Sequence, residues 1–546
     1  MKKNRYIYIG LMTTFLFSVS SCKKELDVKN PNSPTLEQAK TESGILSLST
    51  GGVYINGFLN GDGWLGSGYF SLVSGFQELL ADDVSAEAAN QNVNQVSIPG
   101  YVVLDNGTKI SRPTDQAINL RSNNTRAKQS SNLFYYEWTN MYAMNNALNQ
   151  VLALVDNIPF SGDATTRKNT VKAWCYWWKG YAYAKLGSSY YAGLINDLPN
   201  VVNANYVSSA ALIAESNKNF NLAAGLLGGI TNVGDYTTIM TKLIPSDGQV
   251  GLGAVPTPAM FVHSINTMKA RNILANKKTS DMTAADWASI LTLVNSGITA
   301  GDDVFTGRTN SSNTNGWFDA NAGVVASNTA GPPSQSTFKI TERFIQEFKT
   351  GDKRLANNFG SNPYINQVGG FTFSTRWELF DAKQGKNPKN GAVILADKTP
   401  GNYELYLAGT YEENELMKAE ALINTGQIEL GLASVDAVRA FQGAGLSAVA
   451  GTGLDLAAAK EELRRERRVA LVFRGTSWYD ARRWGVIYDI SKGGGRTNAV
   501  VYGSDGVLNT HATINYNFMD YFDVPADEAD LNPPAAGSAA VVNPNY

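Results

Sequence analysis

Apolar residues recur every three to four positions over long segments of this chain, and this spacing predicts helices. Two pairs of such segments are each joined by a short stretch that carries Gly or Pro, so each pair predicts a helix–turn–helix unit. The pairs are 132–156 with 165–194, and 410–424 with 427–441. Shorter helices are predicted over 35–54 and 69–80. Helical segments of this kind, separated by polar stretches rich in Gly and Asn, predict a mainly α fold.

The segment 165–194 is unusually aromatic, with Trp174, Trp177 and Trp178 close together. Gly180 and Gly187 are interleaved with these rings and would let a neighbouring helix approach closely. Cys175 lies among the tryptophans, where a buried and unreactive thiol is expected.

The densest charge cluster lies at Glu461–Gly485, EELRRERRVALVFRGTSWYDARRWG, in a chain that is only 17% charged overall. It predicts an amphipathic helix closed by Gly475, followed by a second aromatic segment. Two interpretations compete. The arginines could form a nucleic-acid patch, but Glu462 and Glu466 are interleaved with them, which favours a structural ion-pair network and no nucleic-acid partner.

Within this segment the order ERR…L…F.G…W.D..RWG, over Glu466–Gly485, resembles the C-terminal signature of the SusD/RagB family of Bacteroidetes surface lipoproteins. Family members usually carry Glu where this chain has Ala470 and Arg474, and Arg where it has Ser477. The resemblance extends over most of the chain. It implies a tetratricopeptide-like helical frame, SusD-like, with long irregular loop insertions.

The first residues read as a lipoprotein signal peptide over 1–21, with a basic start, an apolar core and the small-small-Cys order that ends at Cys22. We expect Cys22 to carry acyl chains and residues 22–35 to form a tether, which leaves 36–546 as one domain. The alternative is an ordinary cleaved signal peptide with an incidental Cys. With the resemblance, an anchored chain implies a cell-surface position on the outer membrane.

Two low-charge excursions leave the predicted frame, near 55–126 and 302–335, and the second is too long for a simple connector. An exposed indole can stack on the apolar face of a sugar while amides and carboxylates bond its hydroxyls. The candidates for ligand binding are therefore Trp317 with Asn315, Asp319 and Asn321, followed by Trp64 and Trp377. The alternative is that Trp317 plugs its loop onto the frame.

Cofactor chemistry finds little support in the sequence. With two histidines and two cysteines, no zinc-binding or nucleophile motif can be written, and we expect no cofactor. Asp319-Ala-Asn321-Ala-Gly323 has a partial calcium-loop spacing but lacks the later bidentate Glu, so calcium stays open.

The resemblance implies a non-catalytic protein that binds a nutrient and works with a TonB-dependent SusC-like transporter. An oligosaccharide is the expected ligand, and a peptide is the alternative within the same family. Two further alternatives stay open. One is a glycan-cleaving enzyme that uses a pair of carboxylates, and the other is a tetratricopeptide scaffold that binds only protein.

Overall fold

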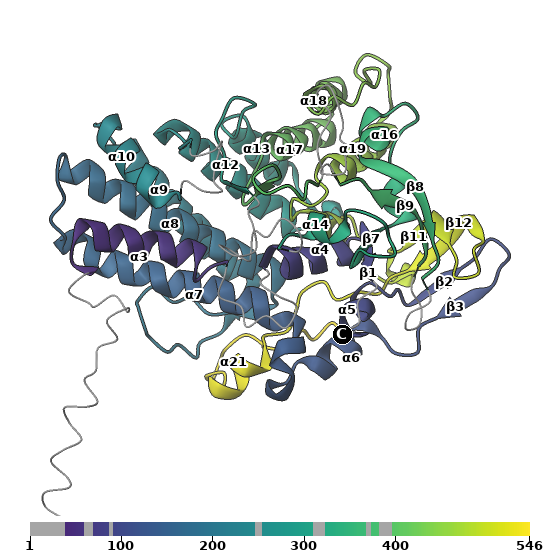
Figure 1. Ribbon diagram of the computed structural model, residues 1–546, viewed down its shortest axis with the longest axis horizontal. Coiled ribbons are helices and arrows are strands. Elements are labelled where there is room, and N and C mark those ends of the chain that lie inside the picture. The colour runs from purple at the N-terminus through teal and green to yellow at the C-terminus, as the bar shows by residue number, and fades with distance from the viewer. Residues whose placement is uncertain are drawn as a thin grey trace, which may run out of the picture.

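A computed structural model of the chain describes residues 39–58, 69–86, 91–245, 254–308, 323–366, 373–381 and 396–546 (Figure 1). The predicted signal peptide at 1–21, the tether at 22–35 and the acylation site Cys22 lie outside these residues. In the part of the chain that the structure describes, no helix is long and apolar enough to cross a membrane.

Helices carry most of the architecture. The longer ones are α3 (Glu42–Tyr54), α7 (Leu133–Leu154), α8 (Ala164–Ser189), α9 (Ser209–Gly228), α10 (Val233–Leu243), α12 (Pro258–Ala275), α13 (Ala284–Val294), α17 (Tyr411–Asn424), α18 (Ile428–Phe441) and α19 (Leu456–Ala470). The shorter ones are η2 (Tyr69–Val73), α4 (Ser74–Leu80), α5 (Gln91–Val96), α6 (Gln116–Asn123), η3 (Arg126–Ser131), η4 (Val155–Asn157), η5 (Thr279–Asp281), α14 (Val325–Thr329), α15 (Glu342–Ile345), α16 (Lys353–Asn358), α20 (Ser477–Arg483), η8 (Ile490–Lys492) and α21 (Ala526–Leu531).

The strands are short and lie mainly at one end of the molecule (Figure 1). They are β1 (Val84–Ala86), β2 (Tyr101–Val103), β3 (Lys109–Ser111), β4 (Ala192–Gly193), β5 (Val207–Ser208), β6 (Thr306–Arg308), β7 (Phe338–Ile340), β8 (Phe359–Tyr364), β9 (Thr375–Leu379), β10 (Glu404–Tyr406), β11 (Arg496–Tyr502) and β12 (Leu508–Asn515). The largest sheet has the order β11-β12-β2-β3, so it joins strands about 400 positions apart in the sequence.

The helix α8 is the centre of the helical part and packs against α3, α7, α9, α10 and α12. Its tryptophans Trp174, Trp177 and Trp178 are fully buried beneath these neighbouring helices. A Cβ atom at Gly180 would lie 2.6 Å from the ring of Phe220 in α9, so glycine is required for this close approach. The prediction of a tightly packed aromatic helix is confirmed.

Both predicted helix–turn–helix units are present, as α7 with α8 and as α17 with α18. The second turn contains Gly426, whose positive φ of 84° suits glycine at the end of α17. Cys175 is fully buried in α8, and this burial raises the pKa of its thiol.

Three predicted helix boundaries are wrong. The helix predicted over 165–194 ends at Ser189, and Ala192–Gly193 form the strand β4. The sequence predicts one helix over 35–54, but α3 begins only at Glu42, where the Thr41 side chain accepts from the Gly44 amide. Residues 35–38 lie outside the described part of the chain. The basic helix α19 ends at Ala470, five residues before Gly475. The residues between α19 and α20 turn instead, with Phe473 at a φ of 60°, because Phe473 is buried in the core.

The arginines of α19 point into the protein and form ion pairs, which confirms the structural interpretation of the charge cluster. Arg467 donates to Asp480 over 2.8 Å, and Arg468 pairs with Asp83 over 2.5 Å. Arg464 pairs with Glu347 over 2.7 Å. These guanidinium groups are mostly buried and are neutralised by carboxylates of other elements. The ion pairs therefore hold α19 against the rest of the fold, and little positive charge remains to bind a phosphate backbone.

Candidate functional site

One small block of structure adjoins four stretches that lie outside the described residues. These stretches are 59–68, 309–322, 367–372 and 382–395. The block consists of η2, α14 and β9, and we call it the loop base. The stretch 59–68 runs directly into η2, and 309–322 ends two residues before α14. The remaining two stretches flank β9. The stretch 367–372 precedes it and 382–395 follows it, each separated from β9 by two described residues.

Specific hydrogen bonds hold the three elements of the loop base together. The side-chain amide of Asn328 in α14 donates to the hydroxyl of Ser71 in η2 over 2.5 Å. The backbone N–H of Gly331, which follows α14, donates to the carbonyl of Leu379 in β9 over 2.8 Å. Segments near residues 70, 330 and 375 are therefore neighbours in the fold.

The aromatic residues of α8 lie under this region. The ring of Phe58, the last described residue before 59–68, lies 5.7 Å from Trp178 and 5.3 Å from Tyr69. The ring of Phe305, just before β6, lies 4.6 Å from Trp177 and 5.4 Å from Trp178. The described residues that precede 59–68 and 309–322 thus pack on the same aromatic helix, which fixes where both excursions begin.

Of the candidate ligand-binding residues, only Trp377 lies in the described part of the chain. It lies on β9 in the loop base, partly buried, and its indole N–H donates to Glu342 over 3.2 Å. Arg376 donates to the same carboxylate over 2.8 Å and is about one-third exposed. The hydrogen bonds to Glu342 raise the pKa of Arg376, so the guanidinium stays charged. The Trp377 ring is therefore held in place by its nitrogen while part of its surface faces outward.

The other candidates, Trp64 and Trp317 with Asn315, Asp319 and Asn321, lie outside the described residues. Their role stays a prediction. The structure does place the described residues that follow the two stretches. These residues form η2 and α14 of the loop base, which also contains Trp377. The sequence alone contained no sign of this convergence.

Chemically, the loop base resembles a carbohydrate-binding surface more than a catalytic centre. A fixed indole beside a charged Arg376 offers a stacking face next to a hydrogen-bond donor. Asn362, which donates to Glu378 over 2.7 Å, adds an amide on the neighbouring strand β8. Among the described residues, no group of three or more His, Cys, Asp and Glu is placed to hold a metal ion.

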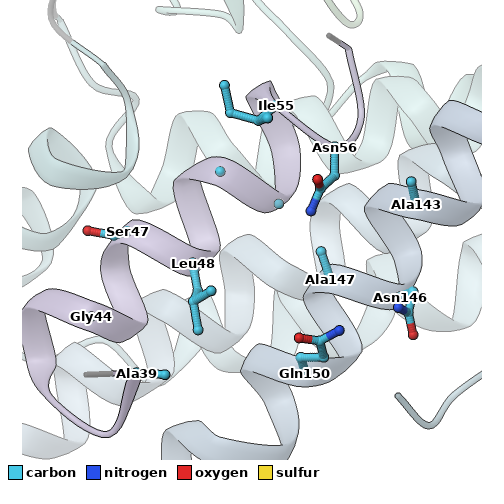
Figure 2. Close-up of a pocket in the computed structure, with 12 residues that line it drawn as sticks. Ala39, Gly44, Ser47, Leu48, Ile55, Asn56, Ala143, Asn146, Ala147 and Gln150 are labelled. Atoms are coloured by element: carbon cyan, nitrogen blue, oxygen red, sulfur yellow. The ribbon is translucent and has the colours of Figure 1, made fainter. Parts of the chain in front are cut away.

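A hollow of about 730 Å³ lies away from these elements, between α3 and α7 (Figure 2). Its lining is mainly small and apolar, and Figure 2 shows the side chains of Leu48, Asn56 and Gln150 lying between the two helices. A Cβ atom at Gly51 would meet no other atom within 4 Å, so this position faces open space. None of its twelve lining residues is aromatic, so this groove offers no ring on which a sugar could stack.

Residues 307–536 match the family model described as the SusD family. This part of the chain belongs to the SusD family. A comparison with curated proteins gave no match.

Solved structures of SusD proteins have the same overall fold as this chain. A SusD-like carbohydrate-binding protein from Bacteroides fragilis is 15% identical, with 90% of this chain and 98% of that chain covered and a TM-score of 0.58. A SusD superfamily protein from Bacteroides vulgatus is 16% identical, with 89% and 96% covered and a TM-score of 0.55. One from Parabacteroides distasonis is 14% identical, with 90% and 98% covered and a TM-score of 0.51. The mainly α, SusD-like fold predicted from the sequence is confirmed.

Proposed function

We propose that this SusD protein is a lipid-anchored, non-catalytic nutrient-binding protein of the outer cell surface. In this proposal it binds an oligosaccharide over the loop base and passes it to a TonB-dependent SusC-like transporter. The observation that carries the proposal is that the described residues following the stretches with Trp64 and Trp317 meet at the loop base, which also holds the fixed ring of Trp377.

Support for the ligand class comes from chemistry and from a relative. Sugar binding needs flat aromatic faces together with hydroxyl-bonding amides and charged groups, and the excursions supply these residue types in a stretch of low charge. The similar structure from Bacteroides fragilis is described as carbohydrate-binding. The membrane position and the transporter partner rest on the lipobox at Cys22 and on family membership.

The decisive experiment is a binding screen of the soluble domain, produced without residues 1–22, against soluble polysaccharides and peptides. We expect a glycan to bind. With that glycan, Trp317→Ala should lower the affinity at least tenfold, equivalent to about 1.4 kcal/mol, with an unchanged melting temperature. Phe441→Ala is the matched control, because this ring is half exposed on α18, away from the loop base.

Three results would overturn parts of the proposal. If only peptides bind, the ligand class is wrong and the peptide-binding alternative holds. If Trp317→Ala binds normally but melts several degrees lower, Trp317 is a structural plug and not a ligand contact. Release of shorter sugars during the screen would indicate a glycan-cleaving enzyme instead.

A further inference from the structure

A patch of large apolar side chains is exposed far from the loop base. The segment 194–206, which connects β4 to β5, leaves Leu198 64%, Val201 49% and Val202 83% exposed. Leu531, at the end of α21, is 68% exposed and lines the same cavity. We call these four residues the apolar rim. Single exposed apolar residues are ordinary, but a cluster around one cavity marks an interaction site.

Hydrogen bonds from α7 fix the backbone of the segment that carries the apolar rim, so the exposure of its apolar side chains is a feature of the fold. The side-chain amides of Asn145 and Asn149 in α7 each donate to the carbonyl of Asn196 over 2.8 Å. Asn146 accepts from the backbone N–H of Asn200 over 2.8 Å. Asn200 itself has a positive φ of 57°, a conformation that Asn tolerates. Leu194 and Tyr206 of this segment are buried, whereas Leu198, Val201 and Val202 face solvent.

The rim surrounds a cavity of about 460 Å³ with an acidic group in its lining. Glu528 of α21 accepts from the indole N–H of Trp138 over 3.3 Å and from the Asn532 amide over 2.9 Å. Both donors are neutral, and within the described residues Glu528 forms no salt bridge, so its negative charge is not balanced by a partner. In Figure 1, α21 lies below α7, which supplies Tyr142 to the same cavity.

We propose that this cavity receives a lysine or arginine side chain from a protein partner, with Glu528 as its counter-ion. The apolar rim would pack against the aliphatic stem of that side chain and against apolar residues beside it, a mode in which long basic side chains bury their stems. A cavity that combines an unbalanced carboxylate with an apolar border is complementary to such a side chain and to few other groups in proteins.

The charges around the cavity select this occupant over two others. Asp527 and Asp530 lie on the same short helix as Glu528, and Arg126 of η3 partly offsets the charge of Asp527. Asp197 is already paired with Lys179 and Lys218 over 3.1 Å each. A second copy of this chain would bring the same acidic helix, and an anionic lipid surface would bring like charge. Both are disfavoured by repulsion, whereas a basic partner is attracted.

The first test measures the cavity directly with a small probe. The full chain, in detergent micelles and with labelled Leu and Val methyl groups, is titrated with acetyl-Leu-Arg-Leu-amide and followed by NMR. We expect shifts of the methyl signals of the apolar rim, and binding at least tenfold weaker when citrulline, the uncharged analogue of arginine, replaces arginine. The variant Glu528→Gln, which keeps an oxygen acceptor for Asn532, should lower the affinity for the arginine peptide at least tenfold while its melting temperature stays unchanged.

Two results of this titration would overturn the proposal. One is equal affinity for the arginine and citrulline peptides, and the other is the absence of shifts at the rim. Should Glu528→Gln melt lower, Val202→Ser provides a second variant, because Val202 is almost fully exposed and its loss cannot disturb the core.

The second test identifies the occupant in the native host. A photo-crosslinking residue is placed at Val202, with Leu430 on α18, which is 59% exposed, as the matched control position. We expect an adduct from Val202 alone, with another protein, and a crosslinked peptide that contains Lys or Arg flanked by apolar residues. An adduct with a second copy of the chain or with lipid would refute the proposal, as would equal crosslinking from both positions. Glycan binding by the Glu528→Gln variant should be normal, which separates this proposal from that of the loop base.

Discussion

The carboxyl group of Glu78 in α4 is expected to be neutral in the folded protein, and its replacement by Gln tests this. Glu78 is fully buried, and neither of its oxygens accepts a hydrogen bond from a described donor. Burial raises the pKa of Glu78 well above its ordinary value of about 4.5, and the nearby carboxylate of Asp83 raises it further. The Ser477 hydroxyl and the Phe473 backbone act in the opposite direction but do not compensate.

The other groups around Glu78 leave the excess negative charge in place. Arg468 of α19 is bound to Asp83 at its Oδ1, whereas Oδ2 of Asp83 has no described hydrogen-bond donor. The buried phenol of Tyr403 also lies near Glu78, and on the far side of α4 the residue Glu137 is paired with Lys185. A proton on Glu78 that is donated to Asp83 would satisfy both carboxyl groups.

The effect on stability follows from the direction of this shift. Because the pKa is higher in the folded than in the unfolded chain, folding takes up a proton, and the stabilisation from that proton is complete only below about pH 4.5. It is lost as the pH rises toward the folded-state pKa. One pKa unit corresponds to about 1.4 kcal/mol, and partial protonation of the unfolded carboxyl at pH 5 reduces the change between pH 5 and pH 6 to about 1.2 kcal/mol.

The amide of the Glu78→Gln variant has no proton to take up, so the free energy of unfolding of this variant minus that of the wild type should increase by about 1.2 kcal/mol from pH 5 to pH 6. Urea unfolding at the two pH values measures this difference, and all other titrating groups cancel in it. Glu461→Gln, at an exposed position on α19, is the control and should show a much smaller change. Parallel pH profiles for the wild type and Glu78→Gln would show that Glu78 is ionised when folded and refute the reasoning.

Three further predictions concern the anchor, the core and the ion pairs. Cys22→Ala should move the protein from the membrane fraction to a soluble fraction, and retention after a high-salt wash would contradict acylation. Trp478→Ala should lower the free energy of unfolding by about 3–5 kcal/mol, because the ring is 1% exposed, and an unchanged melting temperature would contradict this. Burial alone would raise the pKa of Glu466, but Arg354 and Arg439 lower it, so Arg354→Ala should cost about 3–5 kcal/mol in urea unfolding; a loss below about 1 kcal/mol would contradict a buried pair.

Local patterns along the chain were sufficient to predict most of the helical frame. The 3.6-residue period and the Gly or Pro breaks located α7, α8, α17 and α18, because helical hydrogen bonds join residues only four positions apart. Gly180 indicated close helix packing because the lack of a side chain is a property of a single position and can be read from the sequence. The boundary at Gly475 was wrong because burial of Phe473 ends the helix earlier, and burial depends on distant segments.

The sequence by itself therefore determined the helical pairs, the aromatic centre in α8 and the SusD signature at Glu466–Gly485. Only the tertiary structure decided which carboxylates the arginines of α19 meet, that β12 pairs with β2, and that the described residues next to four separate stretches of the chain share the loop base. It also placed Glu528 beside Trp138, almost 400 positions earlier in the chain. The physical reason is that an ion pair or a strand pairing depends on which segments the whole core brings together, and a single residue or a local period carries no record of its partner.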